Sequence, residues 1–231
     1  MDRTHLKLSV WLWAMYLFAN DKRGCSAMQL SKQLGIKYST AWFVLQRLRK
    51  AMQNRDEKYM LEGVVELDDS YFGSPSKNGK RGRGPDKMKV IAALQTEDRK
   101  PKFLKMKTLP NLRGTTIGKY VRKHIKEGSR IESDAYQSYK KPLADKYLHD
   151  FEIFDPNGEK LQWLHTVISN AKAFIQGTYH GIADTHADLY FSEYCFRFNR
   201  RFFHESLFER LAIAALDAPI CRLKSLKSIR S

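Results

Sequence analysis

The chain has 231 residues, of which 42% are hydrophobic, so it can bury a sizeable core and disorder is not expected. Its 41 Lys and Arg against 25 Asp and Glu leave a formal net charge of +16, which favours a polyanionic partner. No polybasic segment flanks a membrane span, so nucleic acid is the first candidate. The three cysteines lack disulfide or zinc-site spacing and indicate a reducing compartment, which we take to be the cytoplasm.

Residues 6–20 are predicted to form a mostly apolar helix that ends at the polar segment 21–24. Basic residues ahead of the apolar run 8–19 imitate a signal peptide. The run is nevertheless too short to span a bilayer, and no small-x-small cleavage site closes it. We therefore interpret it as the packing surface of a folded helix and expect no membrane partner.

Two further helices are predicted before residue 53. Ser26 and Gln29 fit a capping box that opens a short helix ending at Leu34, and Gly35 turns the chain. Ser39 is expected to cap a longer helix, with one apolar face and an opposite face of Thr40, Phe43, Gln46, Arg47 and Lys50. This order predicts a helix-turn-helix whose second element reads the major groove through Thr40, Arg47 and Lys50. An ordinary helical bundle with a solvated basic face is the alternative.

The stretch 64–72 is predicted to be a strand, because Val, Leu, Tyr and Phe suit a pleated sheet and Gly73-Ser74-Pro75 stops it. Alternation along the strand sends Glu66 and Asp68 to one face and Asp69 to the other. Buried carboxylates need a positive partner, and a divalent metal is the strongest candidate. An edge strand with solvated acids is the alternative.

The remaining elements predict a mixed α/β sheet. Strands are expected at 90–94, 103–107 and 130–136, with helices at 115–127, 161–176 and within 185–216. Between the strand at 64–72 and the strand at 90–94 lies a Gly-rich basic loop, residues 76–87, whose Lys80, Arg81 and Arg83 are expected to follow a phosphate backbone. A mobile solvated loop is the alternative reading of such a charge run.

Five stretches in order resemble one known family, the insertion-sequence transposases with an ISXO-type catalytic domain. They are ELDDSYFG (66–73), SDAYQSY (133–139), HTVISN (165–170), GTYHG (177–181) and FRFNRR (196–201). The resemblance runs from the helix-turn-helix to about Phe203. Many members begin with a Cys-rich zinc ribbon, which this sequence lacks.

The resemblance implies a ribonuclease-H-like mixed sheet flanked by helices, preceded by an all-α helix-turn-helix domain. In that family two Asp plus a Glu or Asn hold divalent metal, Mg²⁺ or Mn²⁺, for DNA cleavage and joining. Carried over by position, these residues are Asp68, Asp134 and Asn170, and their oxygens are ligands that suit Mg²⁺. The expected domains are residues 1–56 for DNA binding, 57–215 for catalysis and 216–231 as a basic tail.

Further side chains near these motifs are candidates for the site. Arg197, Arg200 and Arg201 are expected to contact phosphates. Glu193 is the rival third ligand, but Arg197 follows it at i+4, which favours an ordinary helical ion pair. His165 and His180 are candidate neighbours of the phosphate or leaving group, although such histidines are more often structural.

Together these features predict a DNA transposase that binds terminal repeats, hydrolyses the element ends and joins them to target DNA. The expected partners are double-stranded DNA, as element ends and as target, and further copies of the chain assembled on it. One rival is a nuclease or resolvase of the same fold, which cuts without strand transfer. The other is a decayed transposase or a DNA-binding regulator, and the presence of both Asp68 and Asp134 argues against a regulator.

Overall fold

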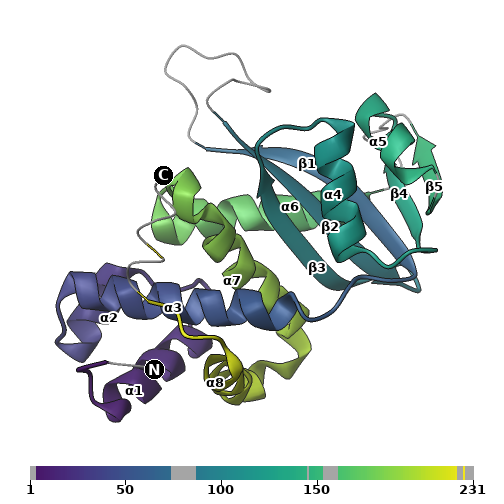
Figure 1. The fold of residues 1–231 in the computed structure, drawn as a ribbon. Helices are drawn as coiled ribbons and strands as arrows, with labels where there is room; N and C mark the ends of the chain where they lie inside the picture. The colour runs from purple at the N-terminus through teal and green to yellow at the C-terminus, as the bar shows by residue number, and fades with distance from the viewer. Residues whose placement is uncertain (1–3, 74–86, 145, 153–160, 223–225, 227–231) are drawn as a thin grey trace. The chain divides into compact units, whose positions relative to one another are not determined.

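The computed structural model describes residues 4–73, 87–144, 146–152, 161–222 and 226. The chain forms two compact units, drawn in Figure 1. We call Tyr59–Lys172 the sheet unit, and Met1–Lys58 together with Ala173–Ser231 the helical unit. The catalytic domain predicted at 57–215 therefore differs from the second compact unit, because the chain after Lys172 packs with the N-terminal helices.

The sheet unit is built on five strands in the order β3-β2-β1-β4-β5. β1 is antiparallel to β2, β2 is antiparallel to β3, and β4 is parallel to both β1 and β5. The strands are β1 (Val64–Phe72), β2 (Met88–Glu97), β3 (Lys100–Leu109), β4 (Arg130–Asp134) and β5 (Leu148–Glu152). The central strand is thus the predicted acidic one, with the predicted bounds.

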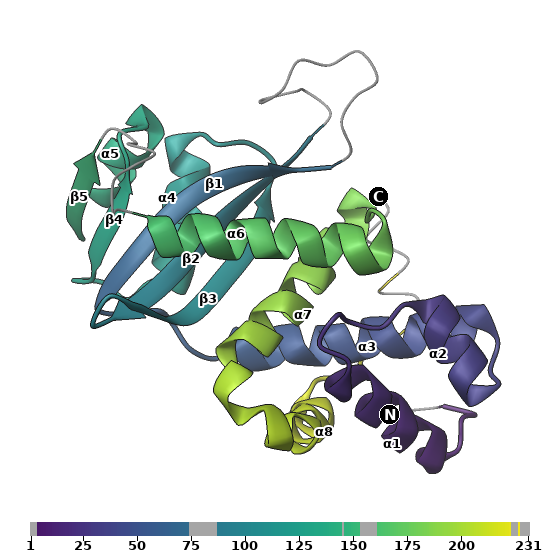
Figure 2. The ribbon, with the colours of Figure 1, turned by 180° about the vertical axis from the view of Figure 1, so that it is seen from behind.

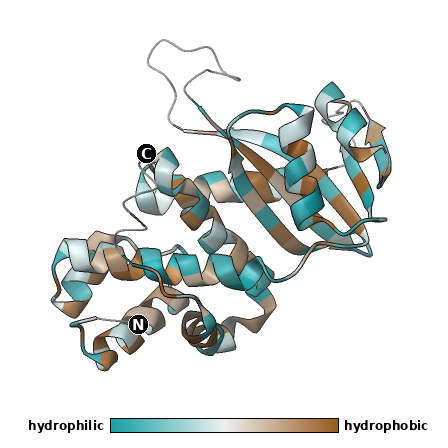
Figure 3. Ribbon diagram, in the orientation of Figure 1, coloured by the Kyte–Doolittle hydropathy of each residue, from teal (hydrophilic) through white to brown (hydrophobic). Residues whose placement is uncertain are grey.

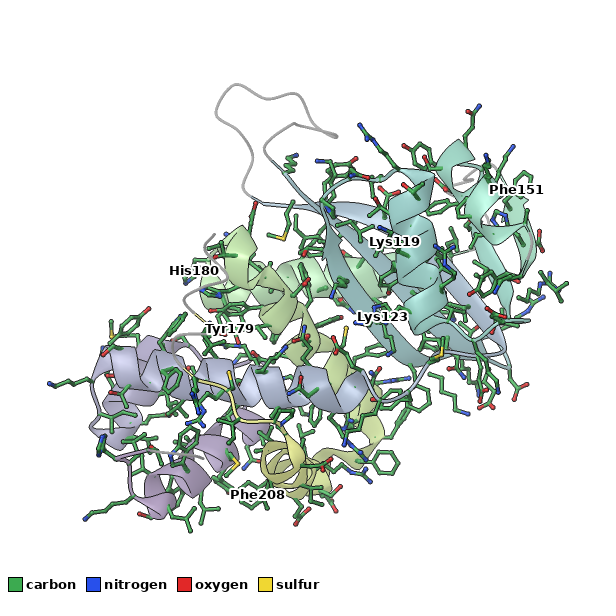
Figure 4. The ribbon with its side chains drawn as sticks, viewed as in Figure 1. Lys119, Lys123, Phe151, Tyr179, His180 and Phe208 are labelled. Carbon is green, nitrogen blue, oxygen red and sulfur yellow. The ribbon has the colours of Figure 1, made fainter. Side chains whose placement is uncertain are left out.

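Helices cover both faces of this sheet. α4 (Gly114–His124) lies on one face in Figure 1, and α6 (Gln162–Phe174) crosses the other in Figure 2. Val65 and Leu67 of β1 are fully buried against Ile117 and Val121 of α4. The outer side of α4 carries Lys119 and Lys123, which are labelled in Figure 4.

The structure confirms the predicted fold class in its architecture, a mixed α/β sheet flanked by helices. Figure 3 shows hydrophobic colouring along the central strands, which agrees with their burial between the helices. Two elements of the sheet unit were not predicted, α5 (Gln137–Leu143) and β5. α5 is short and contains Pro142, and β5 has only five residues, so neither carries a clear periodic pattern.

The helical unit contains the N-terminal helices and about the C-terminal quarter of the chain. Its elements are α1 (Leu8–Asn20), α2 (Ala27–Leu34), α3 (Tyr38–Asp56), η1 (Ile175–Tyr179), η2 (Asp184–His186), α7 (Ala187–Asn199), η3 (Arg201–Ser206) and α8 (Leu207–Asp217). Phe18 of α1, Leu48 of α3, Phe196 of α7 and Leu211 of α8 share one core. In the described part of the chain, every helix is too short or too polar to cross a membrane.

The start of α2 confirms the Ser26 half of the predicted capping box, and the start of α3 corrects the predicted Ser39 cap. The Gln29 side chain, expected on the Ser26 amide, donates to Asp21 Oδ2 at 3.5 Å instead. Ser26 Oγ accepts a hydrogen bond from the Gln29 amide at 3.1 Å, and Gly35 ends α2 at φ 63°. α3 begins at Tyr38, so Ser39 does not cap it; extended Lys37 occupies the cap position instead. Gln46, predicted on the exposed face, is fully buried and donates to the Tyr190 hydroxyl at 3.3 Å.

A buried histidine in the sheet unit is expected to make folding sensitive to acid. His124 is 6% exposed at the end of α4. Burial, together with the charges of Lys105, Lys107 and Lys123, lowers its pKa from 6.5 to about 3. Because the unfolded chain binds the proton more tightly, the stability is complete above pH 6.5 and is lost as the pH falls toward 3.

Urea unfolding at several pH values tests the predicted loss of stability at low pH. The free energy of unfolding of the wild type should fall by about 1.4 kcal/mol per pH unit from this residue alone across that window. His124→Leu should remove that slope, whereas His5→Leu, at an exposed position, should keep it. Equal slopes in His124→Leu and the wild type would contradict the expectation.

Candidate active site

The ends of two neighbouring parallel strands bring Asp68 and Asp134 together. β1 and β4 pair in register from Val64 opposite Arg130 to Leu67 opposite Ser133. One further residue along each strand places Asp68 level with Asp134, and level residues of parallel strands point to the same face. Two aspartates that are far apart in sequence are therefore neighbours at one edge of the site.

Glu66 lies deeper on the same face and contacts the first turn of α6. Its Oε2 accepts a hydrogen bond from the Leu164 amide at 2.9 Å, and the side chain is almost fully buried. Burial raises the pKa of Glu66 to about 7; the Leu164 amide opposes this shift, and nearby Glu132 adds to it. Glu66 thus ties α6 to the central strand.

His165, one residue further along α6, contacts Asp68. Its Nε2 lies 3.1 Å from Asp68 Oδ2, and this hydrogen bond raises the pKa of His165 against the opposing effect of burial. The charges of Glu66 and Asp134 raise the same pKa further, so three carboxylates favour the protonated form of one imidazole. The site therefore contains His165, which the sequence analysis predicted only as a candidate neighbour of the phosphate or leaving group.

Lys172 extends the same face of α6. Seven residues separate it from His165, which places the two side chains about 20° apart around a helix. Burial lowers the pKa of Lys172 and the Asp68 carboxylate opposes this, so its ammonium group lies within the field of the acids. The sequence analysis did not include Lys172, although the seven-residue spacing from His165 is a signal that could have found it.

The opposite face of β1 holds Asp69 away from this group. Asp69 Oδ1 accepts a hydrogen bond from the Tyr139 hydroxyl of α5 at 2.9 Å. Tyr139 is fully buried in the core under α4. The predicted alternation, with Glu66 and Asp68 on one face and Asp69 on the other, is confirmed by these contacts.

Asn170 does not share the face of α6 that meets the acids. It lies five residues after His165, about 140° around the helix, and it is exposed. His165 and Lys172 occupy the side toward Asp68. Asn170, the third ligand carried over from the resemblance, therefore lies on another part of the helix surface than His165, and its role in the site stays a prediction.

The chemical types of the donor atoms at this site, carboxylate oxygens and a ring nitrogen, suit a hard divalent cation. Asp68 and Asp134 offer carboxylate oxygens from adjacent positions, and His165 offers a ring nitrogen beside them. Among the described residues, no three His, Cys, Asp or Glu side chains form a metal-binding group by themselves. Mg²⁺ is commonly held by one or two carboxylates together with substrate phosphates, so the two aspartates fit such an ion.

The motif arginines have internal partners in the helical unit. Arg200 pairs with Asp56 at 2.8 Å, and Arg197 pairs with Glu193 at 3.1 Å; each of these arginine side chains is only 10% exposed. Both arginines thus form buried ion pairs, and their contact with phosphates stays a prediction. Arg201 is half-buried and donates to the Phe198 carbonyl at 2.9 Å.

Glu193, the rival third ligand, belongs to a buried cluster in the helical unit. Its carboxylate accepts from Arg49 at 2.8 Å, from Tyr179 at 3.0 Å and from Arg197 at 3.1 Å. The expected i, i+4 pair with Arg197 is confirmed. Tyr179 and the exposed His180, both labelled in Figure 4, lie at the end of η1 in the same unit.

The predicted DNA contacts on α3 are half-buried. The Arg47 guanidinium lies 5.3 Å from the ring centroids of both Trp11 and Phe43. Lys50 donates to Gln53 at 2.6 Å, and Thr40 is partly covered near the start of the helix. The basic loop residues Lys80, Arg81 and Arg83 lie outside the described residues.

Similar solved structures are transposase complexes of low similarity to this chain. One is described as the crystal structure of the Mos1 strand transfer complex, with 12% identity, a TM-score of 0.31 and coverage of 96% of this chain and 83% of that one. Another is a Mos1 transposase paired-end complex with the left transposon end, with 10% identity, a TM-score of 0.23 and coverage of 91% and 82%. Comparison with curated proteins gave no match.

A family model described as the ISXO2-like transposase domain matches residues 60–199. The match includes Asp68, Asp134, His165 and Glu193 and takes in more than half of the chain. It therefore spans all of β1 to α7, including both aspartates and the histidine that contacts Asp68.

Proposed function

The chain belongs to the ISXO2-like transposase family, and we propose from this that it binds the terminal repeats of an insertion sequence, cleaves DNA at their ends and joins them to target DNA. The observation that carries the proposal is the group of Asp68, Asp134 and His165 on one face of the sheet. Double-stranded DNA and further copies of the chain on that DNA are the proposed partners.

Asp68 and Asp134 would hold a divalent ion, with His165 as the third side chain of the site. When bound, Mg²⁺ or Mn²⁺ supplies charge stabilisation to the attacking and leaving oxygens of the phosphodiester. His165 orients the Asp68 carboxylate through its hydrogen bond, and Glu66 holds α6 in position through the Leu164 amide. Lys172 adds a positive charge on the same helix face, which favours a DNA phosphate beside the acids.

The helical unit is proposed to recognise the element ends. α2 and α3 follow one another in the order predicted for a helix-turn-helix, with Gly35 at the turn. Arg47 and Lys50 are the proposed contacts on α3, together with Thr40. The contact of Arg47 with two aromatic rings limits its rotamers, so less entropy is lost when it binds DNA.

An end-joining assay tests the function as a whole. Purified protein is incubated with a labelled element end, a target plasmid and Mg²⁺, and the DNA products are separated on a gel. Joined DNA is expected. Nicked DNA without joining would favour a nuclease or resolvase, and unchanged DNA that is still bound would favour a decayed transposase or a regulator.

A matched pair of substitutions on α6 tests which side chain completes the site. His165→Ala should lower end cleavage by at least about tenfold, because the group that positions Asp68 is lost. Asn170→Ala should stay within about twofold of the wild type, because its side chain is exposed and lies about 140° around α6 from His165. Circular dichroism confirms that both variants fold. The reverse pattern of activities would return Asn170 to the site.

A further inference from the structure

A pocket in the helical unit gathers four basic side chains apart from the acidic site. It is lined by Lys22 from the turn after α1, by Arg197, Arg200 and Arg201 at the end of α7, and by Ala19 and Leu207. Its cavity volume is about 230 Å³. Since one water molecule takes up about 30 Å³ of liquid, this space admits a phosphate group with some of its hydration.

The ion pairs behind the pocket leave positive charge at its wall. One carboxylate, that of Glu193, is shared by Arg49 and Arg197, so it balances only one of two guanidinium charges. Lys22 at the mouth is exposed. Partial burial lowers the pKa of Arg201, so an anion in the pocket would offset the cost of removing this cation from water.

An exposed aromatic ring adjoins the pocket through Arg201. The Arg201 guanidinium lies 4.2 Å from the ring centroid of Phe198 and 4.4 Å from that of Phe202. Phe202 is nevertheless 80% exposed, more than any other large hydrophobic side chain in the described part of the chain. A single exposed Phe is ordinary, but one that stacks on a basic pocket resembles the aromatic and basic pairing used to hold unpaired nucleic acid.

We propose that this pocket binds a backbone phosphate of single-stranded DNA and that the adjoining base stacks on Phe202. The ring favours an unpaired strand over a duplex, because bases inside a duplex have no free face. The inference rests on the proposed function only in that DNA is the substrate which supplies such a strand. It assigns the helical unit a second DNA contact, separate from the proposed recognition surface on α3.

Fluorescence anisotropy tests the site without any reaction. Full-length protein is titrated, in EDTA, into a labelled single-stranded oligonucleotide of mixed sequence, and in parallel into the matching duplex. Phe202→Ala should weaken single-strand binding by roughly 5- to 150-fold, the effect of losing one stacked base. Lys22→Gln should weaken it too and should reduce the slope of log K against log salt by about 0.7. Both side chains are exposed, so neither change should unfold the chain.

Two neighbouring residues provide matched controls. Arg23→Gln removes the same charge from the adjacent exposed residue, which does not line the pocket. Phe203→Ala removes an exposed ring that stacks on Arg210 instead. Neither control should alter single-strand binding.

Three outcomes would overturn the proposal: equal weakening by Lys22→Gln and Arg23→Gln, no effect of Phe202→Ala, or equal weakening of duplex and single strand by Phe202→Ala. Because no metal is present, these results stand apart from the end-joining assay. A protein that binds the single strand as expected but does not join ends would contradict the proposed function alone.

Discussion

Asp68→Asn and Asp134→Asn are each expected to lower metal-dependent end cleavage by more than about 100-fold, while binding to a labelled element end stays close to that of the wild type. Each substitution removes one negative charge from the pair of carboxylates that the β1 and β4 register brings together. The amide keeps the shape of the side chain, so the loss concerns the charge and not the packing.

Asp150→Asn is the matched control for this prediction. Asp150 lies in β5 of the same sheet and pairs with Arg130 at a partly exposed position. Its loss should change cleavage by less than about twofold, because exposed ion pairs contribute little. Gel assays of cleavage, gel shifts of end binding and circular dichroism are measured on all three variants. A folded Asp68→Asn protein with full activity would overturn the catalytic role of the site.

Glu193→Gln is expected to destabilise the helical unit by about 3–5 kcal/mol, the usual cost of removing one partner of a buried ion pair. Arg49 and Glu193 are 1% and 0% exposed, and their side chains are 2.8 Å apart. Without the carboxylate, the Arg49 guanidinium stays buried with the rings of Tyr179 and Tyr190 but lacks its counter-charge. Urea unfolding followed by tryptophan fluorescence measures the loss.

Glu209→Gln, at an exposed position of α8, is the control and should stay within about 0.5 kcal/mol of the wild type. The comparison also separates the two readings of Glu193. A variant that is as stable as the wild type but inactive in cleavage would make Glu193 a candidate ligand again. A destabilised variant supports its role as the buried partner of two arginines.

Local patterns in the sequence determined much of the sheet unit. The strand at 64–72 was predicted with its observed bounds, because β-branched and aromatic residues end at a Gly-Ser-Pro stop. The opposite directions of Asp68 and Asp69 followed from the period of a strand, which depends on neither the partner strand nor the helices. The Ser26 cap and the Gly35 turn were equally local.

Contacts with residues far away in the sequence determine how deeply the arginines of the motif at 196–201 are buried. The sequence predicts Arg197 and Arg200 to be surface charges, because no pattern in a run of arginines among aromatic residues indicates that they are buried. The pair of Arg197 with Glu193 was predicted from its i, i+4 spacing, but Asp56, which pairs with Arg200, lies more than a hundred residues before it. Pairing across such a separation depends on how α3 and α7 pack and has no signature in the local sequence.

The third side chain of the site shows most clearly which features the sequence determines and which depend on tertiary contacts. The buried residues of α6, Leu164, Val167, Ile168 and Ala171, form one apolar stripe. His165 and Asn170 flank that stripe at about 110° on either side, so the helical period by itself treats them alike. Only the seating of α6 on the sheet, with the Leu164 amide on Glu66, turns the His165 flank toward Asp68. The sequence determined that α6 is amphipathic, and the tertiary contacts decided which flank meets the acids.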